Sequence, residues 1–407
     1  MGAFLADFNA VLSYFKALAV ASLMAGPVVR SARYMTRFRC LGGDCEDTCC
    51  QGWMVPLDEP THRRLTVLAA EQPAAARLLR EGVELTPAGP HFGQLRFAAS
   101  GRCGMLDERG LCGIHAQLGP AALFEVCAPY PRYYNEVDGA LELFGTLSCP
   151  EVARLCLFGD DAFELDAVEL DAAPRKLRNR FNTDAPYYKP YRLLRTHLVE
   201  LLGRAGHTLS EKLFALLWIS SKLGELVHAR AQQLPLAELE SALAGMLADG
   251  VLAYLAQNYR ALKLDGSLAL SVIGAVLGDD AAAGKAVTWT DHVQQRARIA
   301  GPALERAEMC VTRYCQNHLL TTPYMLSDSL FAYARELVRR AATLRVLMQR
   351  GLVAFEGDAA ALDARLVEVV YRFGRRLEHS DIFHRLDETL EQQGLSSFAH
   401  TACFFSV

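Results

Sequence analysis

The hydrophobic and polar positions follow different patterns in the two halves of the chain. From Tyr191 onward, Leu, Ala and Val recur at the three- to four-residue spacing of amphipathic helices, and no alternating strand pattern interrupts them. Thr208 and Glu211 have the spacing of a capping box before one of these helices. We therefore expect the second half to be an α-helical domain. Its helices are predicted over residues 191–204, 209–232, 236–262, 267–277, 291–320, 328–349 and 359–393.

The first half of the chain combines short helices with short extended segments. One helix is predicted from Pro60 to near Gly82, and residues 94–97 are predicted to be extended. Asp138-Gly139 stands between two apolar runs and predicts a two-residue hairpin turn. The predicted fold class is therefore mainly α, with an α+β N-terminal half.

A further helix is predicted to begin near Ser148. Ser148 and Glu151 have capping-box spacing and precede an apolar run. Residues 157–185, which follow, are rich in acidic residues and are predicted to be a loop-like connector. The composition changes after this connector, so we expect a domain boundary there.

These patterns divide the chain into three predicted parts. Residues 1–33 are a helical extension, 34–160 a cysteine-rich metal- or cluster-binding domain with short hairpins, and 161–407 the α-helical domain. The apolar run of the extension is too short to span a bilayer, and Asp7 stands where a secretory signal carries basic residues. Translation from Met24 is a further hypothesis, which the intact mass of the natural protein tests. The helical spacing of the extension is carried by Phe4, Leu5, Phe8, Val11, Leu12, Phe15 and Leu18.

Length and composition narrow the class of protein. A chain of 407 residues is long enough for two or three domains, and 51% hydrophobic with 22% charged residues is typical of globular proteins. Its 42 basic and 46 acidic residues give a net charge of −4. No general excess of basic charge is present, so nucleic acid is not an expected partner. Nothing in the composition specifies an oligomeric state.

The twelve cysteines are the strongest chemical signal. Nine of them lie between Cys40 and Cys156, and four fall within eleven residues beside Gly42 and Gly43, which let the loop fold back. Converging thiols bind zinc or an iron–sulfur cluster, and cysteine ligation does not separate the two metals. Disulfides are less expected, because a chain of this length can bury a core without them. The candidate ligands are Cys40, Cys45, Cys49, Cys50, Cys103, Cys112, Cys127 and Cys149.

The later cysteines are expected to complete one site begun by the first group, or to form a second site. Residues 107–110 predict a turn that brings Cys103 and Cys112 together, and two prolines hold Cys127 in an extended loop. Cys149 is predicted to lie in the first turn of a helix, where the helix dipole favours the thiolate. The cysteines predicted to be core residues are Cys156, Cys310 and Cys315.

Other candidate chemistry is weaker. His115 follows Cys112 closely, but a single histidine on a helix is more often an ordinary surface or core residue than a ligand. His379, Asp381 and His384 form a polar group that either lines a site or marks a solvated helix end. The sequence has no Walker loop, no Gly-x-Gly-x-x-Gly after a strand, no Gly-x-Ser-x-Gly and no His-Glu-x-x-His.

Several stretches together resemble the bacterial flagellin lysine-N-methylase (FliB) family. They are Tyr34-Met35, Phe38-x-Cys40, residues 42–53 (Gly-Gly-x-Cys-Glu-Asp-Thr-Cys-Cys-x-Gly-Trp), Leu111-Cys112-x-Ile114, Leu118-Gly119, Cys127-x-x-Tyr130-Pro131-Arg132 and residues 148–155. The Cys49-Cys50 pair, with Cys103, Cys112 and Cys127, also resembles the YkgJ-type cysteine cluster. The similarity is dense from Tyr34 to Leu155. It is thinner in the helical half, where residues 210–223 and 376–383 are the most similar.

The resemblance implies a cytoplasmic enzyme that transfers a methyl group from S-adenosyl-L-methionine to lysines of flagellin. It also implies a cysteine-bound [4Fe-4S] cluster, with zinc as the alternative metal. Cys45 and Cys49 are followed at once by Cys50, which differs from the Cys-x3-Cys-x2-Cys motif of radical S-adenosylmethionine enzymes. N-methylation needs no radical, because a lysine amine that has lost its proton, with a pKa of about 10.4, attacks the sulfonium methyl directly. The residues hypothesised to orient that lysine are Asp44, Glu46, Asp47 and Tyr130.

The alternative function is non-catalytic. A zinc- or iron-binding scaffold or redox sensor would use the same cysteines, and the helical half would bind a partner. Peripheral membrane association is a further expectation for the Ala- and Leu-rich helices. Iron and sulfide content, measured together with methyl transfer to flagellin, separates the two functions.

Overall fold

The chain is described by a computed structural model over residues 27–51, 54–86, 91–181, 190–229, 235–278 and 287–407. Its contacts form two compact units that interleave along the sequence. The first unit comprises Met1–Thr36, Cys50–Leu143 and Glu164–Phe181, and the second comprises Arg37–Cys49, Phe144–Phe163 and Asn182–Val407. The adjacent residues Cys49 and Cys50 therefore belong to different units. The three-part division at residues 33 and 160 stays a prediction.

The predicted N-terminal helix lies mostly outside the described residues. The described end of that segment is strand β1 (Val28–Ala32), followed by the short helix α2 (Arg33–Thr36). The end of the segment is thus extended rather than helical, because it pairs with strands from much later in the chain.

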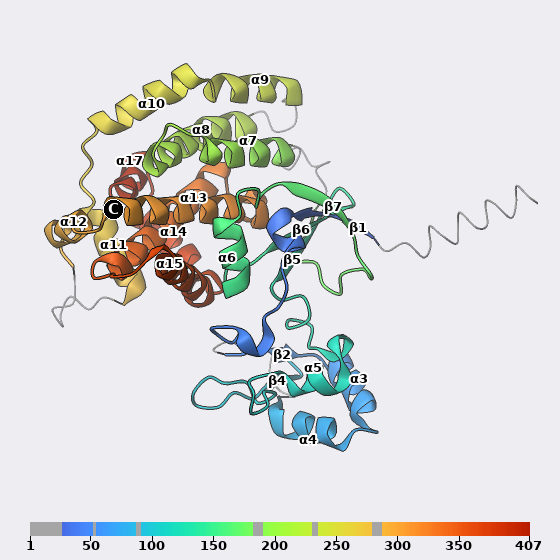
Figure 1. Ribbon diagram of the computed structural model, residues 1–407. Coiled ribbons are helices and arrows are strands. Elements are labelled where there is room, and N and C mark those ends of the chain that lie inside the picture. The colour runs from blue at the N-terminus through green and yellow to red at the C-terminus, as the bar shows by residue number, and fades with distance from the viewer. Residues whose placement is uncertain (1–26, 52–53, 87–90, 182–189, 230–234, 279–286) are drawn as a thin grey trace, which may run out of the picture. The chain divides into compact units, whose positions relative to one another are not determined.

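The first unit contains a five-stranded sheet with the strand order β7-β1-β6-β5-β8 (Figure 1). Strand β1 pairs in parallel with β6 and antiparallel with β7, while β5 pairs in parallel with β8. Strands β5 and β6 are joined at Asp138 and Gly139, both with positive φ, which confirms the predicted two-residue hairpin turn. The other strands are β5 (Arg132–Val137), β6 (Ala140–Gly145), β7 (Leu165–Glu169) and β8 (Asn179–Phe181).

The prediction of a connector without regular structure over residues 157–185 is wrong in part, since β7 and β8 lie within it. Both strands are short and stand at the edges of the sheet, and neither contains a fully buried residue that would mark it as apolar in the sequence. Their partners are also distant in sequence. The guanidinium of Arg33 ties the β7 edge to β1 through Glu164 and Asp166.

A second, three-stranded sheet in the first unit packs with three helices around a separate core. The side chains of Leu65, Met105, Ile114 and Phe124 are almost fully buried in this core. The strand order is β2-β4-β3. The elements are β2 (Pro56–Leu57), α3 (Glu59–Ala69), α4 (Pro73–Gly82), β3 (Val83–Leu85), β4 (Gly93–Leu95) and α5 (Gly113–Leu118).

The helix predicted from Pro60 to Gly82 is two helices. Asp58 caps the first by accepting a hydrogen bond of 2.6 Å from the Thr61 N–H, and α4 begins anew at Pro73. A proline disfavours helical backbone at the residue before it, so the chain breaks there. Strand β4 confirms the extended segment predicted near residues 94–97.

The second unit is helical, which confirms the mainly α fold class. Helix α14 lies at its centre and packs against α8, α13, α15 and α16. The helices are α6 (Pro150–Phe158), α7 (Tyr191–Gly203), α8 (Leu209–Ala229), α9 (Leu236–Met246), α10 (Asp249–Ala261), α11 (Ser267–Leu277), α12 (Trp289–Ala297), α13 (Gly301–Thr321), α14 (Leu330–Leu352), α15 (Ala359–Phe373), α16 (Ile382–Gln392) and α17 (Phe398–Ala402).

Three of the predicted helices are interrupted. Residues 236–262 form α9 and α10, residues 291–320 form parts of α12 and α13, and residues 359–393 form α15, a π-helical turn and α16. Pro302 explains the second break, because it starts α13 and cannot continue a preceding helix. The capping box of Thr208 and Glu211 is confirmed, with reciprocal hydrogen bonds of 2.9 and 3.3 Å.

Helix α14 carries arginines into the core of the second unit. Arg335, Arg340 and Arg345 are all buried, and a buried charge needs a partner. Arg345 donates to Glu308 at 2.8 Å, and Arg335 donates to Asp387 at 3.0 Å. These ion pairs fix α14 against α13 and α16.

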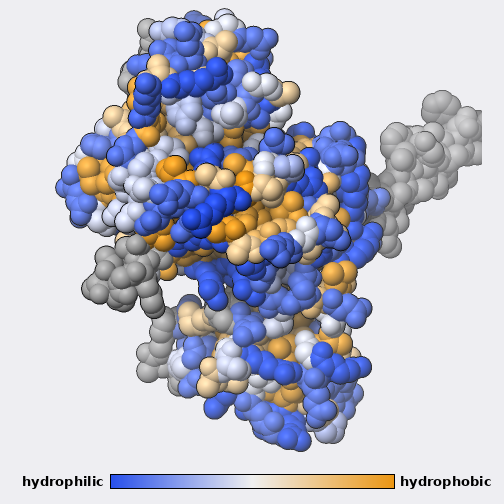
Figure 2. Space-filling view, turned by 60° about the vertical axis from the view of Figure 1, so that its left-hand side comes forward, coloured by the Kyte–Doolittle hydropathy of each residue, from blue (hydrophilic) through white to orange (hydrophobic). Residues whose placement is uncertain are grey.

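No single helix within the described ranges is both long and apolar enough to cross a membrane. Among the helices that the structure describes, α9 and α10 reach that length and composition when taken together, and they are bent by 55° at the break between them. On the face shown in Figure 2, hydrophobic residues of the helical unit gather in patches bordered by hydrophilic ones.

Candidate functional site

Three candidate metal ligands lie on the first segment of the helical unit. This segment, residues 37–49, makes a 3-10 turn at Gly42–Asp44, where Gly42 has a φ of +59° that favours glycine. Cys40 and Cys49 are exposed, and Cys45 is half-buried. Burial raises the pKa of the Cys45 thiol, and the thiols of Cys40 and Cys49 add to this effect. Cys40 and Cys49 thus each lie near Cys45.

Cys149 is the fourth candidate ligand in this unit. It is the N-cap of α6, and the backbone N–H groups of Val152 and Glu151 face its sulfur as the predicted helix start requires. Burial nevertheless outweighs these donors and raises the pKa of Cys149 to about 12, so the protein alone keeps a thiol there. Cys45 and Cys49 also act on this pKa, which places Cys149 near both of them.

The predicted Ser148–Glu151 capping box does not form. No side chain caps α6, and Glu151 instead pairs with Arg154. Ser148 is fully buried, and its hydroxyl lies 3.0 Å from Thr146 Oγ1 and 3.0 Å from His379 Nε2. The hydroxyl is thus engaged away from the helix end, and it helps to hold the loop before Cys149.

Arg375 joins the two cysteine-bearing segments of the helical unit. Its Nη1 donates to the Thr48 carbonyl at 2.8 Å and lies 2.8 Å from the Asp47 carboxylate. Its Nε donates to the Ser148 carbonyl at 3.0 Å, and the guanidinium lies 5.2 Å from the centre of the Tyr371 ring. One guanidinium therefore fixes the residue before Cys49 and the residue before Cys149. We call this set of contacts the Arg375 clamp.

The clamp stands on a π-helical turn, Gly374–Glu378, a distortion often found at functional sites. A Cβ at Gly374 would lie 3.0 Å from the backbone N and Cα of Ser148, so the turn and the Ser148 loop approach as closely as glycine allows. At the other end, Glu378 accepts a hydrogen bond from Tyr314. Burial alone would raise the pKa of Glu378, but His318, Arg340 and Tyr314 lower it to about 2.

The candidate lysine-orienting residues divide between the two units. Asp44, Glu46 and Asp47 lie on the segment 37–49 of the helical unit, which we call the cysteine loop. Tyr130 is half-buried in the first unit. Asp44 is exposed, and Glu46 pairs with Arg154 of α6. Asp47 is held by the Arg375 clamp.

The remaining four candidate ligands belong to the first unit. Cys103 is buried in the core around the three-stranded sheet, and its N–H donates to the Cys50 carbonyl at 3.0 Å. Cys50, Cys112 and Cys127 are partly buried and pack against the same core. The predicted turn over residues 107–110 is present, but it places Leu106 rather than Cys103 opposite Cys112.

The chemistry of these eight thiols fits a zinc ion or an iron–sulfur cluster. All twelve cysteines are free of disulfides, and thiolates are the preferred ligands of both metals. Within the described residues, no three His, Cys, Asp or Glu side chains already stand in a metal-holding arrangement. The donors are thus present in two groups of four, one in each unit.

The other candidates separate into core and surface residues. Cys156, Cys310 and Cys315 are fully buried, which confirms them as core. His115 is exposed on α5. His379, Asp381 and His384 do not converge: His379 contacts Ser148, whereas the other two pair along α16 with Arg385 and Glu388.

Sequence reasoning missed Arg375, and it noted Arg154 only within the similar stretch 148–155, without a role. These two arginines hold the cysteine loop. Both are distant in sequence from the loop, and arginine is common on helices, so neither residue type nor spacing singles them out. The stretch 376–383, noted for its similarity, begins just after Arg375.

Comparison with known proteins places the chain in a family. Residues 195–404 match the FliB lysine N-methylase C-terminal domain. The chain is 29% identical over 251 residues to a lysine-N-methylase of Salmonella typhimurium (strain LT2), covering 60% of this chain and 59% of that protein. A lysine-N-methylase of Salmonella choleraesuis (strain SC-B67) gives the same figures.

A third relative is the flagellar biosynthetic protein FliU of Salmonella muenchen, 32% identical over 165 residues, or 39% of this chain and 94% of that protein. No solved structure matches the chain. The match thus spans about three fifths of the length of the first two relatives. The match to the family's C-terminal domain, however, covers more than half of this chain. The protein therefore belongs to the FliB lysine N-methylase family.

Proposed function

We propose that the protein is a cytoplasmic methyltransferase that moves the methyl group of S-adenosyl-L-methionine to lysine side chains of flagellin. The observation that carries the proposal is the match of residues 195–404 to the C-terminal domain of the lysine N-methylase family. The name of the FliU relative supports a flagellar substrate. The absence of a basic field is consistent with a protein rather than a nucleic-acid substrate.

We also propose that the enzyme depends on a cysteine-ligated [4Fe-4S] cluster. Its ligands are drawn from the eight grouped cysteines, of which Cys40, Cys45, Cys49 and Cys149 belong to the helical unit. When bound, such a cluster supplies an electron-poor iron that can hold the amino and carboxylate groups of the methyl donor. The protein's part is to fix the loops, which the Arg375 clamp does by binding main-chain atoms beside Cys49 and Cys149.

The acidic residues of the cysteine loop would orient the lysine for attack. Glu46 and Asp47 are each held by an arginine, so their carboxylates are fixed in place rather than free to rotate. The amine must lose its proton before it attacks, and exclusion of water from an ammonium group lowers its pKa toward neutrality. Transfer then forms a nitrogen–carbon bond, breaks the sulfur–methyl bond and leaves S-adenosylhomocysteine.

The test is purification without oxygen, followed by measurement of iron, sulfide and visible absorption. Methyl transfer from labelled S-adenosylmethionine to flagellin is measured on the same sample. We expect about four iron and four sulfide per chain, as a [4Fe-4S] cluster requires, together with lysine methylation. Full methylation by an iron-free protein would remove the cluster from the proposal. Zinc without any transfer would favour the non-catalytic scaffold.

Separate Cys49→Ser and Cys50→Ser variants identify ligands. The adjacent residues belong to different units, so we expect their iron losses to differ. A ligand's variant should lose both iron and activity, while a Cys315→Ser variant should retain the cluster because Cys315 is a buried core residue.

A further inference from the structure

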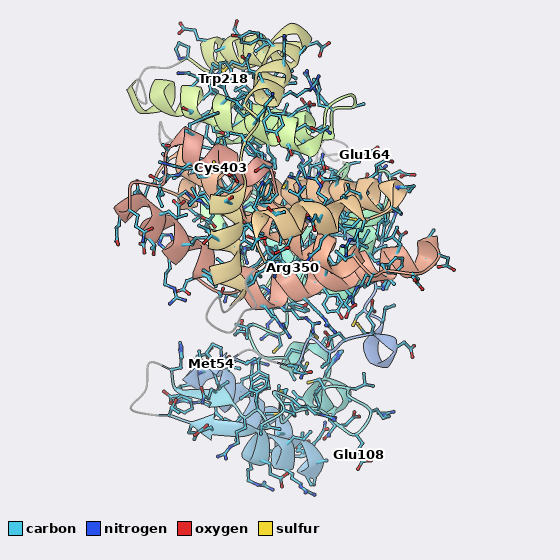
Figure 3. All side chains as sticks on the ribbon, turned by 90° about the vertical axis from the view of Figure 1, so that its left-hand side faces the viewer. Met54, Glu108, Glu164, Trp218, Arg350 and Cys403 are labelled. Atoms are coloured by element: carbon cyan, nitrogen blue, oxygen red, sulfur yellow. The ribbon has the colours of Figure 1, made fainter. Side chains whose placement is uncertain are left out.

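An open groove lies in the helical unit beside the cysteine loop. It occupies about 670 Å³ and is formed by the chain from the end of α14 to α15, with Glu46 of the cysteine loop at its border. Arg350, which immediately precedes this chain segment, is labelled in Figure 3. This volume lies within the usual range of small-ligand pockets, about 300–1,000 Å³.

The groove carries an uncommitted negative charge. Its wall contains the carboxylates of Glu46, Glu356 and Glu368 and the guanidinium groups of Arg365 and Arg372. Both arginines lie 2.8 Å from Glu368 and share its single carboxylate. The three glutamates and two arginines of the wall therefore sum to a charge of −1. Glu46 forms an ion pair with Arg154 of α6. Glu356 is exposed and forms no ion pair within the part of the chain that the structure describes.

Aromatic side chains form the apolar part of the same wall. Phe355 is half-buried beside Glu356, and Tyr371 is buried on α15. The Phe355 ring rests on Gly357, where an added Cβ would come within 2.7 Å of the ring and 3.1 Å of the Ala361 side chain. Glycine at this position therefore leaves room for the ring. A carboxylate beside a fixed aromatic ring is the combination that attracts an ammonium group on an apolar stem.

We propose that this groove binds the segment of the protein substrate that carries the target lysine. The lysine first binds as an ammonium beside Glu356, with its methylene chain along Phe355 and Tyr371. Glu46, one of the residues proposed to orient the amine for attack, lies at the border of the same groove. This inference rests on the proposed function, because it names where that reaction's substrate is held. Uncharged side chains of the same length cannot pair with Glu356, so the groove favours lysine over them.

Direct binding tests the groove without relying on catalysis. The probe is a fluorescent Ala-Ala-Lys-Ala-Ala peptide, and the comparison peptide has norleucine in place of lysine. Glu356→Lys should weaken binding of the lysine peptide by about tenfold or more, the equivalent of one charge-assisted hydrogen bond. The matched control is Glu240→Lys, an equal charge change at an exposed position of α9, which should bind as the parent does. Phe355→Leu should weaken binding about threefold through lost contact with the stem.

Equal binding of the two peptides, or unchanged binding by Glu356→Lys, overturns the inference. Displacement of the peptide by S-adenosylhomocysteine also overturns it, because the groove would then hold the methyl donor. Transfer to flagellin is measured separately and should show a KM raised about tenfold in Glu356→Lys with kcat changed less than twofold. A parent protein that binds the peptide but transfers no methyl group refutes the proposed function and leaves the groove standing. An active parent whose KM is unaffected by Glu356→Lys refutes the groove alone.

Discussion

The Arg375 clamp predicts that one side chain stabilises the whole cysteine loop of the helical unit. Arg375→Ala removes two hydrogen bonds to main-chain carbonyls and the ion pair with Asp47. The arginine side chain is only 18% exposed, so water compensates incompletely for these losses. Hydrogen bonds to charged groups contribute about 1.5–3 kcal/mol each when partly buried. Allowing for water at the freed carbonyls, we expect a loss of about 2–4 kcal/mol in unfolding free energy.

The matched control is Arg376→Ala, which changes the same charge at an exposed neighbouring position and should cost no more than about 0.5 kcal/mol. Arg375→Lys should be intermediate, because an ammonium keeps the charge but cannot serve three acceptors in the fixed geometry of a guanidinium. Thermal unfolding of the helical unit measures the effect, at roughly 2 °C per kcal/mol for a domain of this size. A second readout is iron bound after anaerobic purification. Equal melting temperatures and equal iron in the two alanine variants would refute the clamp.

Three further predictions concern positions outside the clamp's own side chain. Burial and neighbouring arginines lower the pKa of His292 to about 4, below the 6.5 of an unfolded histidine. The stability that depends on neutral His292 is therefore fully present above pH 6.5. Up to about 3 kcal/mol of unfolding free energy is lost as the pH falls to 4. Between pH 6.5 and 4 the His292→Gln variant should lose less unfolding free energy than the parent protein, as measured by urea unfolding at each pH. An equal loss in the two proteins would contradict this origin. Gly374→Ala brings a methyl group against the Ser148 backbone and should lower the unfolding free energy by about 1–3 kcal/mol. It should also reduce bound iron. An unchanged iron content would show that the close approach is dispensable. Leu65→Ala empties a fully buried position of the first unit and should cost about 2–5 kcal/mol in urea unfolding without altering the peptide binding of the second unit.

Local patterns predicted the helices well because each depends on nearby residues. The capping box of Thr208 and Glu211 and the Asp138-Gly139 turn are complete within four residues, and both are present. Proline explains two of the helix breaks, but the π-helical turn after α15 has no comparable marker. That turn depends on contact with the Ser148 loop, which is more than two hundred positions away.

Long-range pairing limited the predictions of strands and of the candidate site. Strands β7 and β8 are short edge strands whose partners lie elsewhere in the chain, so neither shows a clear alternation. The eight cysteines were evident from their spacing, yet their division into two groups of four was not. The prediction that the helix start favours a thiolate at Cys149 was limited in a related way. The helix start could be predicted from the sequence, but the burial that raises the pKa of Cys149 comes from tertiary packing.

The interleaving of the two units has a consequence for how this protein can be shortened or inherited. Removing everything outside residues 195–404 would delete α6, which packs on α13 and α15, and the loop that Arg375 binds. No single cut in the chain separates the two units from each other, because their segments alternate along the sequence. We expect recombination and gene fusion to preserve the span from the first strand to the last helix as one block, with tolerated joints only beyond its ends.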